Sequence, residues 1–262
     1  MDSFDNVYVL ESAYGNRCIL KFTANGELIS QWGSYGEGNG QFREPSGIGI
    51  DKFNNLYVAD YSNNCIMKFT PDGKFIAKWG EKGIGPGQFD MVYDVAVDSK
   101  GNVYSADDSR IQKFSSDGKF LEEWGMNKDG KFDGAVSIAI DSSDNIYVLE
   151  SGNNRIQKLA PDGKFITKWG SEGADYNQFS SPQGIATDVC GNIYVADYSN
   201  CRIQKFTSDG EFITMWGSSG SGDGQFIKPR GIAVDSKGNV YVTDTGNQRI
   251  QKFRPKTKPI NK

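Results

Sequence analysis

The sequence predicts an all-β fold, a six-bladed β-propeller with four-stranded antiparallel blades, and two periodic markers support this assignment. A run of an aliphatic residue followed by tyrosine occurs six times, and the tyrosines lie 49, 47, 43, 47 and 47 residues apart. Five tryptophans repeat at 47, 45, 45 and 47 residues. Periods of about 40 to 50 residues built from short strands are typical of propeller blades. The markers are Tyr8, Tyr57, Tyr104, Tyr147, Tyr194 and Tyr241, with Trp32, Trp79, Trp124, Trp169 and Trp216.

Each repeat contains up to four strand-like segments, which we name a, b, c and d from the propeller axis to its rim. Near the C-terminus, segment a is 231–235 (GIAVD), segment b is 239–244 (NVYVTD) and segment c is 249–253 (RIQKF). The preceding unit supplies segment d at 211–217 (EFITMWG). Each segment is rich in β-branched or aromatic residues and is bounded by Gly, Asn, Asp or Pro, as strands are. No segment repeats every 3.6 residues, so we expect essentially no helix.

The connections between segments are as regular as the segments. Tight turns such as 236–239 (SKGN) join a to b, and turns such as 71–73 (PDG) join c to d, with Gly taking the positive φ. The d–a connections are long and Gly-rich, and we expect a Phe in each to fill the gap between neighbouring blades. Because strand direction alternates, the b–c and d–a loops share one face, named the loop face. The a–b and c–d turns share the opposite turn face.

The string at 231–253, GIAVD-x3-NVYVxDTGNQRIQKF, resembles the NHL repeat, a family of typically six-bladed β-propellers. The resemblance implies one domain over residues 1–253, followed by a basic tail at 254–262. The first unit begins at segment b and the sixth stops after segment c. The sequence therefore predicts 22 strands, whereas six complete blades need 24. Either the chain is cut from a longer array or the terminal blades are three-stranded. The predicted units lie near 6–45, 46–91, 92–134, 135–182, 183–228 and 229–253.

Composition excludes several function classes. The formal net charge of −4 and the pI near 5.1 argue against binding of nucleic acid, which depends on clustered Lys and Arg. Histidine is absent, which excludes Ser-His-Asp and Cys-His nucleophile pairs, a His base and His-ligated zinc. No run of residues is long and apolar enough to span a membrane. The first ten residues lack the features of a signal peptide, so we expect a soluble chain, either cytoplasmic or excised from a cell-surface protein.

The four cysteines show no metal-binding or redox spacing. Cys190 and Cys201 are separated by a strand of about six residues, roughly 20 Å, which exceeds the ~7 Å Cα limit for a disulfide. Cys18 and Cys65 occupy nearly equivalent positions in successive units. We therefore expect four free thiols.

Segment b ends in a carboxylate in every unit, and segment c begins with Arg in four of them. We predict structural salt bridges within blades, of the surface type that contributes about 0.2–1 kcal/mol each. The alternative is a ring of carboxylates around a cation. Because every acid except Asp60 has an Arg nearby, we predict no metal site and no cofactor. The predicted pairs are Asp107–Arg110, Glu150–Arg155, Asp197–Arg202 and Asp244–Arg249.

The non-repeating residues gather on the predicted loop face, and variation at fixed positions is how a repeat protein presents specificity. The third b–c loop, 107–110, is two residues shorter than the standard, so we expect any groove to be asymmetric near the third blade. The alternative is that these are ordinary solvated loop residues. The candidate partner-binding residues are Tyr14, Tyr61, Tyr93, Asp94, Gln183, Tyr198 and Arg230.

These observations favour a non-enzymatic scaffold that recognises a protein, peptide or glycan. Some NHL propellers bind RNA through a basic face, but here the d–a loops carry more acidic than basic side chains. The repeat also resembles, more distantly, calcium-dependent hydrolases and amidating lyases. The lyases use His-bound metal, and a calcium site needs converging oxygens where only Asp94 is a candidate. A third hypothesis is a segment of an adhesive cell-surface array that contributes avidity.

Overall fold

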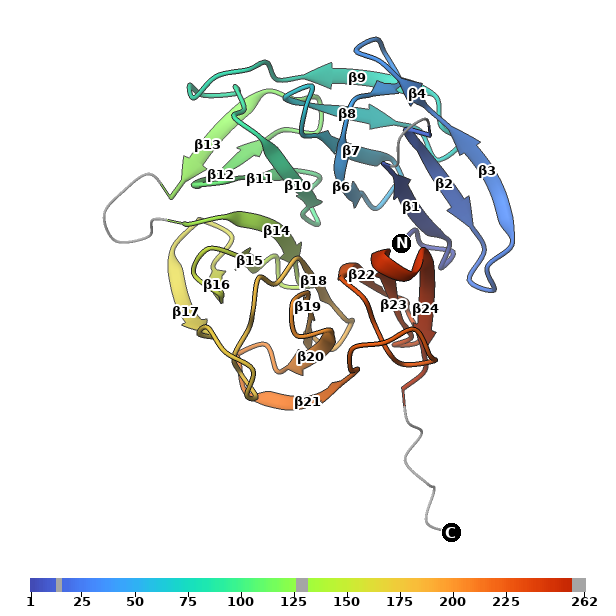
Figure 1. Cartoon of the computed structure of the whole chain (residues 1–262). Coiled ribbons are helices and arrows are strands. Elements are labelled where there is room, and N and C mark those ends of the chain that lie inside the picture. Colours follow the sequence, from blue (N-terminus) through green and yellow to red (C-terminus); the bar gives the residue numbers. More distant parts are fainter. Residues whose placement is uncertain (13–15, 126–131, 256–262) are drawn as a thin grey trace.

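A computed structural model describes residues 1–12, 16–125 and 132–255, and its strands form a ring of six antiparallel blades (Figure 1). Blade 1 contains β1 (Val7–Glu11), β2 (Cys18–Phe22) and β3 (Leu28–Trp32). Blade 2 contains β6 (Pro45–Ile50), β7 (Leu56–Asp60), β8 (Cys65–Phe69) and β9 (Phe75–Trp79). Blade 3 contains β10 (Val92–Val97), β11 (Val103–Asp107), β12 (Arg110–Phe114) and β13 (Phe120–Trp124).

The remaining blades follow the same order from axis to rim. Blade 4 contains β14 (Ala135–Ile140), β15 (Ile146–Glu150), β16 (Arg155–Leu159) and β17 (Phe165–Trp169). Blade 5 contains β18 (Gly184–Thr187), β19 (Ile193–Asp197), β20 (Arg202–Phe206) and β21 (Phe212–Trp216). Blade 6 contains β22 (Pro229–Val234), β23 (Val240–Asp244) and β24 (Arg249–Phe253). The predicted six-bladed fold is confirmed, and the terminal blades are each three-stranded.

Two short elements lie outside the blades. In the first d–a loop, β4 (Ser34–Tyr35) pairs in parallel with β5 (Gln41–Phe42). A single 3-10 turn, η1 (Thr245–Asn247), occupies the last b–c loop and is the only helical element of the described residues. The expectation of almost no helix therefore holds. Within the same residues, no helix is long and apolar enough to cross a membrane.

The core lies between the blades, where aromatic rings from the d–a loops pack on the c strands. Phe89 is fully buried and its ring centroid lies 5.7 Å from that of Phe114 in the next blade. Phe42, Phe179 and Phe226 repeat this contact with their own c-strand partners at 5.6–5.8 Å. The d–a loop phenylalanines thus fill the gaps between blades, as predicted. All four cysteines are free thiols.

An Asp–Asn–Tyr network closes the a–b turn of blades 2 to 6 and the turn that precedes β1, and it explains the tyrosine repeat. The Asp98 carboxylate accepts hydrogen bonds from the Lys100 and Asn102 backbone N–H groups at 3.0 and 2.8 Å. The same carboxylate accepts a hydrogen bond from the Tyr104 hydroxyl at 3.0 Å. Burial of the Tyr104 hydroxyl raises its pKa, and the negative charge of Asp98 raises it further. Tyr8, Tyr57, Tyr147, Tyr194 and Tyr241 donate to the Asp six residues before them.

The ring closes where blade 6 meets blade 1 (Figure 1). There Ser236 Oγ donates to Asp5 Oδ2 at 2.8 Å, as Ser99 Oγ donates to Asp144 Oδ2 at 2.7 Å between blades 3 and 4. The closing interface therefore repeats a contact made between consecutive blades, although no strand of the described residues crosses from one terminal blade to the other.

Candidate functional site

The b–c and d–a loops hydrogen-bond to each other, which places them on one face. The Tyr61 backbone N–H donates to the Glu44 carbonyl at 3.0 Å, and the Ser199 N–H donates to the Ser180 carbonyl at 3.1 Å. Each contact joins a b–c loop to the d–a loop that precedes its blade. The loop face thus consists of paired loops held in a defined shape.

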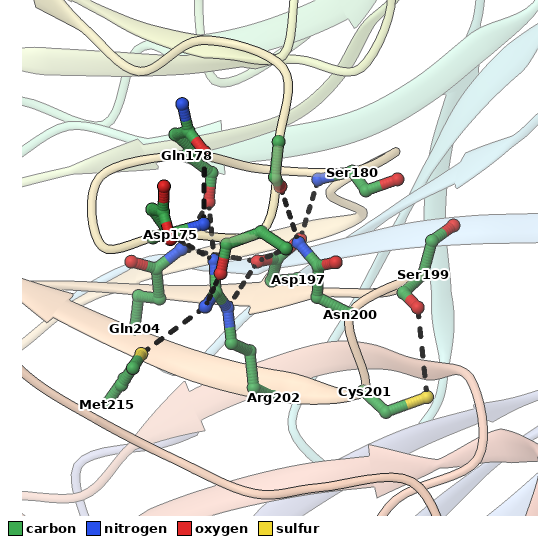
Figure 2. Close-up of polar contacts among 12 residues, drawn as sticks. Asp175, Gln178, Ser180, Asp197, Ser199, Asn200, Cys201, Arg202, Gln204 and Met215 are labelled. Carbon is green, nitrogen blue, oxygen red and sulfur yellow. Dashed lines mark hydrogen bonds and ion pairs between the residues drawn. The ribbon is translucent and has the colours of Figure 1, made fainter.

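Asp197, at the end of β19, connects the b–c loop of blade 5 to the d–a loop that precedes this blade (Figure 2). Its buried carboxylate accepts from the Ser180 backbone N–H at 2.8 Å and from Asn200 Nδ2 at 2.9 Å. Arg202 Nε donates to the same carboxylate at 2.8 Å, while the Arg202 guanidinium also donates to the Gln178 carbonyl at 2.8 Å. One buried ion pair therefore ties strand b, strand c and the d–a loop together.

The structure places all four predicted acid–Arg pairs in contact and buries them more deeply than surface pairs. The carboxylates are at most 4% exposed. Burial raises the pKa of Asp107 to about 6, which outweighs the lowering effect of the Arg110 charge. The distances are 3.0 Å for Asp107–Arg110, 2.7 Å for Glu150–Arg155, 2.8 Å for Asp197–Arg202 and 2.8 Å for Asp244–Arg249.

Asp60, which has no Arg in its b–c loop, is held by neutral donors instead. Its carboxylate accepts from the backbone N–H groups of Arg43 and Glu44, each at 2.9 Å, and from Asn63 Nδ2 at 2.8 Å. Asp60 thus accepts hydrogen bonds from loop donors, as Asp197 does. Among the described residues, no group of three or more His, Cys, Asp or Glu side chains is arranged to hold a metal ion.

The aromatic and Arg candidates form two separate clusters on the loop face. The rings of Tyr61 and Tyr93 meet edge to face, with centroids 5.2 Å apart, at the boundary of blades 2 and 3. The exposed Arg230 guanidinium lies 5.8 Å from the centroid of the Tyr198 ring, at the boundary of blades 5 and 6. The structure therefore brings these candidates together in pairs. Tyr14 lies outside the described residues.

Two other candidates take part in contacts between blades. The Asp94 carboxylate accepts from Ser137 Oγ at 2.7 Å and from the Ile138 N–H at 3.1 Å, joining β10 to β14. Burial raises the pKa of Asp94 to about 6. Gln183 Nε2 lies 3.4 Å from Ser151 Oγ in the preceding blade. Sequence reasoning gave no sign of these contacts, because their partners are more than 30 residues away.

Two open hollows flank the short b–c loop of blade 3, both bordered by Asp108 and Ser109. The larger measures about 570 Å³ and is lined by Asp108, Ser109, Phe132, Asp133, Asn153 and Arg155. The smaller measures about 240 Å³ and is lined by Ile84, Asp90, Met91, Asp107, Asp108, Ser109 and Arg110. Met91 Sδ also lies 2.7 Å from the Tyr61 hydroxyl, so the smaller hollow adjoins the Tyr61–Tyr93 pair. Both hollows thus lie at the third blade, where the sequence predicts an asymmetric groove.

Comparison with protein families supports the repeat assignment. The model described as NHL repeat matches residues 132–159, 179–206 and 226–253. A model described as 6-bladed beta-propeller matches residues 54–129. No curated protein matches the sequence.

Solved structures share the fold at low sequence identity. The virginiamycin B lyase of Staphylococcus aureus aligns over 98% of this chain and 84% of its own, with 17% identity and a TM-score of 0.65. A catalytically inactive His-to-Ala variant of that lyase with quinupristin aligns over 98% and 87%, with 16% identity and a TM-score of 0.63. A Bacteroides thetaiotaomicron protein of unknown function covers 96% and 67%, with 14% identity and a TM-score of 0.70. At these identities the likeness concerns the fold alone.

Proposed function

The chain is an NHL-repeat β-propeller, and we propose that it is a non-enzymatic scaffold whose loop face binds a protein, peptide or glycan. The observation that carries the proposal is the Tyr61–Tyr93 pair beside the hollow lined by Met91. These side chains stand at positions where the repeat varies from unit to unit. A propeller is a scaffold on which unrelated sites occur, so the function is argued from this surface.

The chemistry of the surface favours a protein or peptide among the three partner classes. Tyr, Met and Arg are enriched at protein interfaces. Tyr and Arg are also among the residues whose truncation to alanine most often weakens binding strongly. The Tyr61–Tyr93 pair presents aromatic edges, and Arg230 is exposed beside Tyr198. Asp90 and Asp108 at the smaller hollow favour a partner with a basic or neutral contact region.

The structural likeness to virginiamycin B lyase suggests an enzyme as the competing function. The lyase variant in which a histidine is replaced by alanine is described as catalytically inactive. This chain contains no histidine, so that residue of the lyase has no counterpart here. Asp94, the one acid considered for a calcium site near the axis, accepts hydrogen bonds from Ser137 and Ile138 instead. These points support a binding role.

The proposal is tested by probing peptide and glycan arrays with the purified chain. A loop-face variant, Tyr61→Ala with Tyr93→Ala and Arg230→Ala, should lose the binding seen with the wild-type chain. A turn-face control, Lys74→Ala with Lys119→Ala and Lys237→Ala, should retain it. Loss of binding in the turn-face control, with binding kept by the loop-face variant, would place recognition on the wrong face for this proposal.

A further inference from the structure

In blades 1 to 5, the outermost strand ends in a Trp that fills a pocket built by two blades. Each Trp lies opposite an isoleucine of strand c that is fully buried. In four cases its ring also covers the glycine of the next c–d turn, so closely that a Cβ there would come within 2.4–2.6 Å of the ring. The pairs are Trp32–Gly73, Trp79–Gly118, Trp124–Gly163 and Trp169–Gly210.

Blade 6 and blade 1 provide both walls of a sixth pocket, which we name the seam and define by Ile250, Phe253 and Gly26. Ile250 on β24 is the counterpart of the buried isoleucines, yet 40% of its surface is exposed. Gly26 is the counterpart of the covered glycines, but no described atom lies within 4 Å of the position a Cβ would take. Within the described residues, β24 pairs with β23 alone.

The two walls belong to one site. Lys252 Nζ on β24 donates to the Ala24 carbonyl at 2.9 Å, in the turn that contains Gly26. In an occupied site, Lys68 Nζ donates in the same way to the Ser116 carbonyl at 2.9 Å. As far as the described residues go, the seam therefore has the geometry of an occupied interblade site without its outer strand (Figure 1).

The occupied sites define the chemistry of the missing strand. In the last position its Trp faces the strand-c isoleucine. In blades 2, 3 and 5 the first position is a Phe that packs edge to face on a strand-c Phe. These Phe–Phe centroids are 6.1 Å apart for Phe69–Phe75 and 6.0 Å for Phe206–Phe212. Phe253 on β24 presents the equivalent ring. The stretch 254–262 (RPKTKPINK) contains two prolines and no aromatic residue, so its sequence does not match this strand.

We propose that the seam docks an extended segment of a separate polypeptide, with Phe and Trp four residues apart, antiparallel to β24. Main-chain hydrogen bonds to the free edge of β24 supply affinity, and the two aromatic pockets supply specificity. A second copy of this chain is a poorer occupant, because its strands of this pattern are already paired in its own blades 1–5. The seam is distinct from the loop-face hollow, so its occupant adds a second partner.

A fluorescein-labelled peptide with the sequence of residues 71–80, PDGKFIAKWG, is the probe, and anisotropy against the full chain is the measurement. We expect saturable one-to-one binding that weakens at least tenfold when the peptide carries Trp79→Ala. Ile250→Glu in the protein should weaken it similarly. Ile213→Glu, on β21 with 44% of the Ile213 surface exposed, is the matched control and should leave the affinity unchanged.

The inference is wrong if the peptide does not bind, or if the alanine peptide binds as tightly as its parent. Equal weakening by Ile250→Glu and Ile213→Glu would also overturn it. Sedimentation velocity of the peptide-free chain addresses the second-copy alternative. A concentration-dependent dimer that Ile250→Glu abolishes, without any peptide binding, would assign the seam to self-association and contradict the proposal.

Discussion

Asp94 on β10 and Ser137 on β14 join blades 3 and 4 near the axis, through a 2.7 Å hydrogen bond from the Ser137 hydroxyl to the Asp94 carboxylate. Both residues stand where the repeat varies. The neighbouring blade approaches closely, since a Cβ at Gly47 would come 2.5 Å from Asp94 Cα. Variation at these positions therefore reflects packing between blades as well as any recognition at the mouth of the ring.

Replacing Asp94 tests the consequence of its burial. Burial raises the pKa of Asp94 from 3.8 to about 6, so protonation favours the folded state. The stabilisation is complete below about pH 4 and is lost as the pH rises through 6. Between pH 4 and 7, the free energy of unfolding of the wild-type chain should therefore fall by up to about 3 kcal/mol relative to that of Asp94→Asn. Urea unfolding of both proteins at each pH measures this, and a constant difference across the range would refute it.

Removing the carboxylate of Asp197 should strongly destabilise the fold. Asp197→Ala leaves the buried Arg202 guanidinium without its counter-charge, and breaking such a buried pair costs about 3–5 kcal/mol. Asp162→Ala breaks the exposed Asp162–Lys164 pair and should leave the melting temperature nearly unchanged. Calorimetry of both variants provides the comparison. Similar melting temperatures for the two would show that the loop clamp contributes little.

Two glycines in equivalent c–d turns provide a matched test of the Trp pocket. Gly118 and Gly26 both have a φ of +89°, so alanine is strained in either turn by about 1 kcal/mol. At Gly118 the added Cβ would also lie 2.5 Å from the Trp79 ring, whereas at Gly26 it meets no described atom. Gly118→Ala should therefore lower the free energy of unfolding clearly more than Gly26→Ala. Equal losses in chemical denaturation would mean that Trp79 moves aside freely.

Local features of the sequence were sufficient to predict the fold. The period of Tyr and Trp predicts the blades, and the charges at the two ends of each b–c loop predict the pairs Asp197–Arg202 and Asp244–Arg249. Burial of these pairs is harder to predict, because it arises when the d–a loop folds over them, as Ser180 does on Asp197. The Asp–Asn–Tyr network could have been predicted from the spacing of the residues, because Asp98 stands six residues before Tyr104 and the other units repeat this spacing.

Relationships between distant parts of the chain were not predictable in the same way. The Ser236–Asp5 contact that helps to close the ring joins residues 231 positions apart. The Tyr61–Tyr93 pair depends on how blades 2 and 3 meet, so sequence reasoning could place each residue on the loop face but not bring the rings together. Packing between blades also decides which side chains remain available on the loop face. The Asp94 carboxylate, for example, accepts a hydrogen bond from Ser137 of the next blade.

The central claim, that the loop face recognises the partner, is tested most directly by the affinity for one ligand identified from the arrays. Tyr93→Ala should weaken binding by about 2 kcal/mol, or about 30-fold, because aromatic anchors beside a hollow supply most of the energy of an interface. Lys119→Ala on the turn face should leave the dissociation constant within twofold of the wild-type value. The reverse pattern, with unchanged affinity for Tyr93→Ala and a large loss for Lys119→Ala, would contradict the claim.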